Sequence, residues 1–284
     1  MKAQRRVKIS IWALALPAVW LATSASAQEE CRLVPLETGA VHACVFGEGP
    51  VTVVLAAGAG QTSGTWNALV PRLASSVRVV TFDRPGLGQS PPSRSPRTPT
   101  QIGRELHAVV KSLDLAGPLI LVGHSIGGVH VLRYATMYPR QVAGLVILDT
   151  PPPGFERNRL VLLTPPEREE RQRLLERGLA NAPEVVRLER EGAHNLVEWD
   201  FSAFPGTVPV AVVVADSQDF GNLGSQAAHR RLWVEGSREW VGLSTSARLT
   251  IAEGSGHMVH HDRPEMVLSQ VLAMIGAADK GRRQ

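Results

Sequence analysis

The alternation of continuously apolar segments with helical segments is the feature that most restricts how this chain can fold. Six short segments are rich in Val, Leu and Ile, at residues 51–57, 77–82, 119–122, 142–148, 208–214 and 247–252. Such uninterrupted runs are typical of strands buried on both faces of a parallel sheet. Helical patterns lie at residues 66–74, 100–113, 126–138, 225–240 and 264–275. The order predicts an α/β fold with a doubly wound, mostly parallel sheet, whose site lies at the carboxyl ends of the strands.

Residues 150–206 interrupt this alternation. They contain no strand pattern, but charged helical runs occur at 165–177 and 183–191. We predict a helical cap insertion here, above a core formed by residues 28–149 and 207–284. Glu and Arg at helical spacing favour a solvated helix face with i,i+4 ion pairs over an anion or nucleic-acid site.

The first 27 residues have the pattern of a secretory signal peptide. Four Lys and Arg residues form a basic start, residues 11–22 are apolar, and Ala25-Ser26-Ala27 offers the small side chains of a cleavage site. A retained anchor is the alternative, but about a dozen apolar residues are fewer than the roughly 20 that cross a bilayer. We expect cleavage near Ala27, export to the periplasm or the extracellular space, and no stable membrane anchor.

The mildly basic charge of the chain comes from this leader. The chain has 30 Lys and Arg against 26 Asp and Glu, a formal charge of +4. Four of the basic residues and none of the acidic ones lie within residues 1–27, so the remainder is balanced. A balanced charge gives no support for a nucleic-acid partner or an anionic membrane surface.

Two cysteines, Cys31 and Cys44, flank a predicted antiparallel hairpin formed by residues 32–36 and 41–46. A turn centred on Glu37 and Thr38 places the two cysteines opposite each other. In an exported protein we expect a disulfide, worth about 3 kcal/mol in the chain-entropy model, and the alternative is two free buried thiols. Two cysteines exclude a four-thiolate zinc site and a disulfide-dense scaffold.

The strongest chemical signal is the sequence Gly123-His124-Ser125-Ile126-Gly127, which follows an apolar strand and opens a helix. A G-x-S-x-G sequence in that context is typical of a nucleophile elbow. The turn strains the backbone of the serine, and the glycines Gly123 and Gly127 leave room for the close approach. A Gly-rich packing turn is the alternative. We predict that Ser125 is the nucleophile.

A serine hydroxyl needs a base to accept its proton. His257 follows Gly254-Ser255-Gly256, after the last predicted strand and before the final helix, and is the best placed of nine histidines. His260 and His261 lie close behind it, and His124, next to the nucleophile, is expected to project away from the serine side chain. The sequence therefore favours His257 as the catalytic base.

The acid that orients the imidazole is expected after a strand that lies between Ser125 and His257 in the chain. Asp219 follows the predicted strand 208–214 and is our first choice. Asp216, in the same loop, and Asp149, after the preceding strand, are the alternatives. Geometry, which the sequence does not give, decides among them.

Acyl transfer also needs hydrogen-bond donors for the tetrahedral oxyanion. The backbone N–H of Ile126 would supply one. The second is expected from the small residues after the first strong strand, where Ala59 is our choice and Gly60 its rival. A phosphate loop is the competing interpretation of this Gly-rich stretch, but no Lys-Ser or Lys-Thr follows it.

These motifs together resemble the α/β-hydrolase superfamily, in particular bacterial serine hydrolases of the AB hydrolase-1 type. The residues that carry the resemblance are Ala57-Gly58-Ala59-Gly60, Phe82-Asp83-Arg84-Pro85-Gly86-Leu87-Gly88-Gln89-Ser90, the G-x-S-x-G elbow, Val142-Ala143-Gly144-Leu145-Val146, and Gly256-His257 with Pro264-Glu265 downstream. The chain departs from it at Ala57, where many members carry His, and at Asp216, where Gly is usual. The resemblance implies structural loop roles for Asp83 and Arg84.

The expected function is hydrolysis of a carboxylic ester in a small to medium acyl substrate, through a Ser-His-Asp triad and without metal or organic cofactor. Amide, lactone or carbon–carbon bond hydrolysis, perhydrolysis and acyl transfer are alternatives on the same machinery. A non-catalytic ligand-binding protein of the same fold is the alternative from another class. Several residues are candidates for the apolar pocket: Trp199, Phe201, Phe204, Phe220 and Met258.

Overall fold

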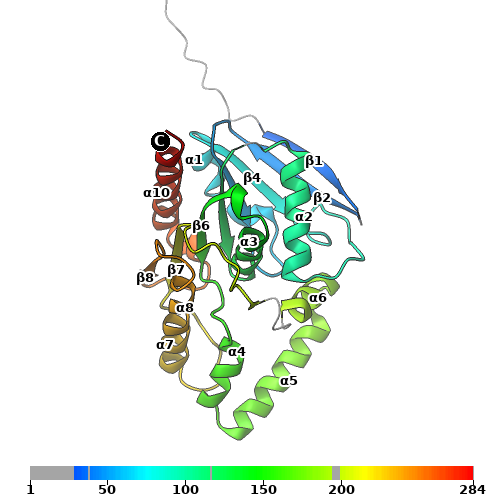
Figure 1. Ribbon diagram of the computed structural model, residues 1–284. Helices are drawn as coiled ribbons and strands as arrows, with labels where there is room; N and C mark the ends of the chain where they lie inside the picture. The colour runs from blue at the N-terminus through cyan, green and yellow to red at the C-terminus, as the bar shows by residue number, and fades with distance from the viewer. Residues whose placement is uncertain (1–28, 38, 116, 194–198, 284) are drawn as a thin grey trace, which may run out of the picture.

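A computed structural model describes residues 29–37, 39–115, 117–193 and 199–283 (Figure 1). The predicted signal peptide, residues 1–27, and its cleavage site lie outside the described residues and remain predictions. Among the described residues, no helix is both long enough and apolar enough to span a membrane.

One sheet of eight strands forms the centre of the molecule, in the order β1-β2-β4-β3-β5-β6-β7-β8. The six strands from β3 to β8 pair in parallel, while β1 and β2 are antiparallel to each other and β2 is antiparallel to β4. The strands are β1 Glu29–Leu36, β2 Gly39–Phe46, β3 Thr52–Ala56, β4 Arg78–Asp83, β5 Leu119–His124, β6 Val142–Leu148, β7 Val210–Ala215 and β8 Arg248–Ala252. The α/β fold predicted from the sequence is confirmed.

Helices cover both faces of this sheet, which explains why its strands are apolar without alternation. Side chains of β5 divide by period two, with Leu121 in the core that contacts α2 and α3 and Val122 in the core that contacts α1 and α10. The helices of the two layers appear on opposite sides of the strands in Figure 1. Their bounds are α1 Val70–Ala74, α2 Pro99–Ser112, α3 Ile126–Met137 and α10 Pro264–Arg283.

Two predicted helices differ from the observed ones. The predicted helix 225–240 is two helices, α7 Gln226–Gly236 and α8 Arg238–Val241. Between them, the Ser237 N–H and hydroxyl both donate to the carbonyl of Trp233, at 3.0 Å and 2.8 Å, and such a second bond from serine often bends a helix. The predicted helix 66–74 becomes the 3-10 helix η1 Ser63–Trp66 and the short α1, because Pro71 has no backbone donor and is tolerated only in a first helical turn.

The described residues between β6 and β7 form helices and connecting loops but no strand. These are α4 Phe155–Asn158, η3 Arg159–Leu162, α5 Pro165–Asn181 and α6 Glu184–Ala193. Helix α5 has no buried residue, and its surface carries ion pairs such as Arg173–Glu170 at 2.9 Å. Two further short helices, η2 Pro139–Gln141 and α9 Val259–Asp262, complete the described structure.

Strands β1 and β2 form the predicted hairpin. Cys31 is the register partner of Cys44, as the predicted turn requires, and their sulfurs form a disulfide. His42 lies close enough to both cysteines for the three to hold a metal ion, but sulfurs joined in a disulfide are not thiolate ligands. The hairpin therefore serves as a cross-linked edge of the sheet.

Candidate active site

Ser125 lies between the end of β5 and the start of α3, with φ 53° and ψ −129°. A positive φ at a non-glycine residue costs of order 1–3 kcal/mol and persists only where the surroundings impose it. Here the Ser125 N–H donates to the carbonyl of Leu148 at 2.9 Å, and the Ser125 carbonyl accepts from Gly128 N–H at 2.9 Å. The predicted elbow is therefore present as a strained strand-to-helix turn.

The two glycines of the elbow are required by backbone contacts. A Cβ on Gly123 would lie 2.5 Å from the carbonyl oxygen of Gly127. A Cβ on Gly127 would lie 2.4 Å from the carbonyl oxygen of Ala56. Because these neighbours are main-chain atoms of β3 and α3, they cannot rotate away, and only glycine fits.

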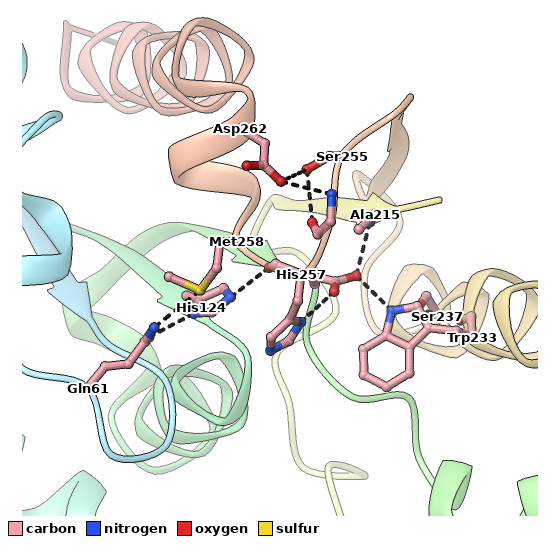
Figure 2. Close-up of polar contacts among 11 residues, drawn as sticks. Gln61, His124, Ala215, Trp233, Ser237, Ser255, His257, Met258 and Asp262 are labelled. Atoms are coloured by element: carbon pink, nitrogen blue, oxygen red, sulfur yellow. Dashed lines mark hydrogen bonds and ion pairs between the residues drawn. The ribbon is translucent and has the colours of Figure 1, made fainter. Parts of the chain in front are cut away.

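His257, in the loop between β8 and α9, lies beside a buried carboxylate. Its Nδ1 donates to Oδ2 of Asp149 at 2.6 Å. The side chain of Asp149 is fully buried, and its Oδ1 accepts from the backbone N–H of Ala215 at 3.0 Å and from Nε1 of Trp233 at 2.7 Å. His257 and Trp233, both labelled in Figure 2, thus bond to different oxygens of this carboxylate. With Nδ1 protonated, Nε2 of His257 is the nitrogen left to accept a proton.

Asp149, and not the predicted Asp219, is thus the acid that orients His257. Asp219 is exposed, and its Oδ1 accepts from the N–H of Gly221 at 2.9 Å and from Nε2 of Gln226 at 3.0 Å. Asp216 accepts from the N–H of Gly254 at 2.7 Å. The Asp219 carboxylate therefore binds within its own loop and the start of α7, and the Asp216 carboxylate binds the turn after β8. Asp149 comes immediately after β6, the neighbour of β5 in the sheet, so its carboxylate lies at the same strand edge as Ser125.

Ser125 and His257 both line one pocket of about 780 Å³ at the carboxyl ends of the strands. Both residues are described in the structure, and no hydrogen bond joins the Ser125 hydroxyl to the His257 imidazole. Catalytic hydrogen bonds are often long in a free enzyme and shorten when substrate is bound. The structure therefore brings the two side chains to one cavity without a direct hydrogen bond between them.

Two residues that line this pocket are those predicted to supply the oxyanion donors. Ile126 is the first residue of α3, so its N–H has no partner within the helix, and it lines the pocket with Ala59. Both positions are those expected for the oxyanion donors. Of the predicted pocket residues, Trp199 and Phe220 line it, whereas Phe201 and Phe204 are buried in the core.

His124 lies directly behind the loop that carries His257. Its Nε2 donates to the carbonyl of His257 at 2.9 Å, and its Nδ1 lies 3.0 Å from the side-chain amide of Gln61. The Gln61 amide nitrogen donates to Sδ of Met258 at 3.2 Å (Figure 2). The Gln61 carbonyl oxygen accepts from the N–H of Gly58 at 3.0 Å. These bonds connect the loop that carries Ala59 with the loop that carries His257. Sequence analysis missed this role, for which the only signal was a histidine inside the G-x-S-x-G elbow.

Burial keeps the histidines behind the site neutral. Desolvation, followed by the charge of His257, lowers the pKa of His124 to about 3. For His260, desolvation is again the largest cause, and the charge of the neighbouring His124 is the second; together they lower its pKa to about 2. The His124 ring lies 4.7 Å from that of His257 and 4.5 Å from that of His260, between centroids. Only uncharged rings can pack so closely in a buried cluster without a counter-charge.

Comparison with known proteins agrees with this geometry. A family model described as the alpha/beta hydrolase family matches residues 53–270. The chain is 26% identical over 279 residues to the esterase Rv0045c of Mycobacterium tuberculosis (strain ATCC 25618 / H37Rv), covering 84% of this chain and 88% of that protein. It is 27% identical over 238 residues to the uncharacterized protein YqjL of Bacillus subtilis (strain 168), covering 81% of this chain and 88% of that one.

Among solved structures, the haloalkane dehalogenase DatA from Agrobacterium tumefaciens C58 superposes with a TM-score of 0.62. It is 18% identical, with 88% of this chain and 97% of DatA covered. At that identity the likeness shows a shared fold alone. The family match covers most of the described residues and includes the serine elbow, so the chain belongs to the alpha/beta hydrolase family and is a hydrolase.

Proposed function

We propose that the chain hydrolyses a carboxylic ester of small to medium size through an acyl-enzyme formed on Ser125. The observation that carries this proposal is the pairing of the fully buried Asp149 with His257, which lines the same pocket as Ser125. An imidazole held in this tautomer offers Nε2 as the acceptor for the serine proton. The esterase Rv0045c among the relatives supports an ester as the substrate.

In the first half of the reaction, Nε2 of His257 takes the hydroxyl proton as Ser125 Oγ attacks the ester carbonyl. The negative charge that develops on the carbonyl oxygen is stabilised by the N–H groups of Ile126 and Ala59. The imidazolium then gives its proton to the leaving alkoxide, and the alcohol departs. Asp149 stabilises the imidazolium and keeps its ring in position.

In the second half, water gives a proton to His257 and attacks the acyl carbonyl. Collapse of the second tetrahedral intermediate breaks the bond to Ser125 Oγ, which recovers the proton from His257. The acid product leaves, and the free enzyme is restored. Each step uses groups of this chain and water.

The test uses a fluorophosphonate probe and a panel of p-nitrophenyl esters of increasing acyl length. We expect the wild-type chain to be labelled and to cleave at least one ester, and Ser125→Ala to lose labelling and about 10³-fold or more in kcat. A Ser125→Ala variant that keeps most of the esterase activity would contradict the assignment. An unlabelled, inactive wild type would favour the ligand-binding alternative, and lactone and amide panels separate the other hydrolytic alternatives.

A further inference from the structure

A buried ion pair connects the helical segment after β6 with the loop that carries Ala59. Arg84, just after β4, donates from Nε to Oε1 of Glu189 at 2.6 Å and from Nη2 to Oε2 at 2.9 Å. Glu189 belongs to α6. The Arg84 and Glu189 side chains are 2% and 1% exposed, so neither charged group is solvated by bulk water.

The same guanidinium also holds two carbonyl groups of the Ala59 loop. Arg84 Nη1 donates to the carbonyl of Ala57 at 2.7 Å, and Nη2 donates to the carbonyl of Gly58 at 2.8 Å. The rigid fork of arginine fixes the directions of such bonds. The Gly58 carbonyl also accepts from the N–H of Gln61 at 3.2 Å, so the plane of the peptide between Gly58 and Ala59 is held by Arg84 from behind and by Gln61 within the loop.

The position of this peptide plane decides where the Ala59 N–H points. In a trans peptide the carbonyl and the N–H lie in one plane and point in opposite directions. Because the Gly58 carbonyl points to the buried Arg84, the N–H of Ala59 points away from it, toward the side on which Ala59 lines the pocket. Arg84 thus orients a donor that it does not touch.

Helix α6 lies directly on this part of the core. A Cβ on Gly60 would lie 3.2 Å from Val186, and a Cβ on Gly86 would lie 3.1 Å from Val185. A Cβ on Gly192 would lie 2.5 Å from the carbonyl oxygen of Arg97. The glycines allow the helix to approach closely enough for Glu189 to reach Arg84.

We propose that Arg84 and Glu189 are positioning residues for the oxyanion site, so that α6, by docking onto the core, completes the alignment of the Ala59 N–H. This inference rests on the proposed ester hydrolysis. It gives the helical segment after β6 a role in transition-state stabilisation in addition to any role in shaping the pocket. Removing the carboxylate charge of Glu189 leaves Arg84 without its counter-ion. The Arg84 guanidinium can then move away from the carbonyls of Ala57 and Gly58.

The test compares Glu189→Gln and Arg84→Lys with the wild type on one p-nitrophenyl ester. Rates are normalised to the amount of enzyme that a fluorophosphonate labels at completion. We expect each variant to lose about 10- to 100-fold in kcat with KM within about threefold, because the lost alignment acts on the transition state. The Ki of a trifluoromethyl ketone, which forms a hemiketal oxyanion, should rise by the same factor as kcat/KM falls.

The matched control is Glu105→Gln. Arg97 and Glu105 form a second bidentate pair, 2.7 Å in both bonds and 2% and 5% exposed, whose hydrogen bonds among the described residues do not reach the Ala59 loop. This variant should lower the thermal midpoint much as Glu189→Gln does, with kcat within about threefold of wild type. If Glu189→Gln does not fold, Arg84→Lys, which keeps the positive charge, carries the comparison.

Two results overturn the positioning proposal. One is a kcat and a ketone Ki in Glu189→Gln and Arg84→Lys that stay within threefold of wild type. The other is a loss of kcat no larger than that of Glu105→Gln. If the wild type is neither labelled nor active, the proposed function fails. Amide hydrogen exchange of residues 57–61 then tests the positioning proposal by itself. Exchange in Glu189→Gln that is unchanged from wild type would contradict it.

Discussion

At the residue scale, the buried carboxylate of Asp149 accepts three hydrogen bonds and donates none. Replacement by asparagine keeps the shape but removes the charge, and the amide N–H₂ can face the N–H of Trp233 or the ring of His257 unfavourably. We expect Asp149→Asn to lower kcat by about 10³- to 10⁴-fold, because His257 then loses the tautomer that accepts the serine proton. Steady-state kinetics on a p-nitrophenyl ester measures the effect.

The comparison variant is Asp219→Asn, which removes the acid that the sequence favoured. Its carboxylate binds the turn at Gly221 and the side chain of Gln226, so we expect less than about a tenfold loss in kcat. A loss in Asp219→Asn as large as that in Asp149→Asn would show that the loop after β7 supplies the acid in solution.

At the scale of the elements, the contact between α3 and the end of β3 sets the elbow. A methyl group on Gly127 would lie 2.4 Å and 2.6 Å from the carbonyl oxygens of Ala56 and Ala57. We expect Gly127→Ala to lower the free energy of unfolding by about 2 kcal/mol or more, since the backbone of β3 must move to admit it. Denaturant unfolding followed by circular dichroism measures the change.

Gly178, inside the exposed helix α5, is the matched control, because a Cβ there would meet nothing within 4 Å. Alanine is the better helix former, so Gly178→Ala should raise the free energy of unfolding by about 0.5–1 kcal/mol. Equal effects of the two substitutions would contradict the packing argument for the elbow.

At the scale of the whole molecule, the core contains histidines that folding keeps uncharged. Desolvation lowers the pKa of His124 to about 3 and of His260 to about 2, and it places the pKa of His130 well below its usual range. In the unfolded chain each ring has a pKa near 6.5. Below that pH the unfolded state binds more protons than the folded state, so stability falls as the pH falls.

Each such histidine contributes a slope of up to about 1.4 kcal/mol per pH unit. We expect the free energy of unfolding to decrease from pH 7 to pH 5, and His260→Asn to reduce that slope between pH 6 and pH 5 by about 1 kcal/mol per unit. Denaturant titrations at fixed ionic strength provide the values. A slope that is the same in wild type and His260→Asn would mean that His260 is charged in the folded protein.

Local signals account for what the sequence predicted well. Continuous apolar strands indicate a sheet covered on both faces, and the predicted hairpin register paired Cys31 with Cys44. The elbow around Ser125 combined a strand, two glycines and a helix start within a few neighbouring residues. The place of His257 after the last strand follows from chain order. Each of these depends on residues that are close in sequence or on the order of the strands.

The partners across the sheet required the tertiary structure. Asp149 and Asp219 both follow strands, and the sequence favoured the wrong one as partner of His257, because the direction of a carboxylate depends on the turn that carries it. The ion pair of Arg84 with Glu189 joins residues 105 positions apart, and nothing local to either side chain shows that they meet. The sequence alone determined the strands, the strained elbow at Ser125 and the fold. Only the tertiary structure decided which charged groups face each other, because burial leaves each charge a single geometry in which it is compensated.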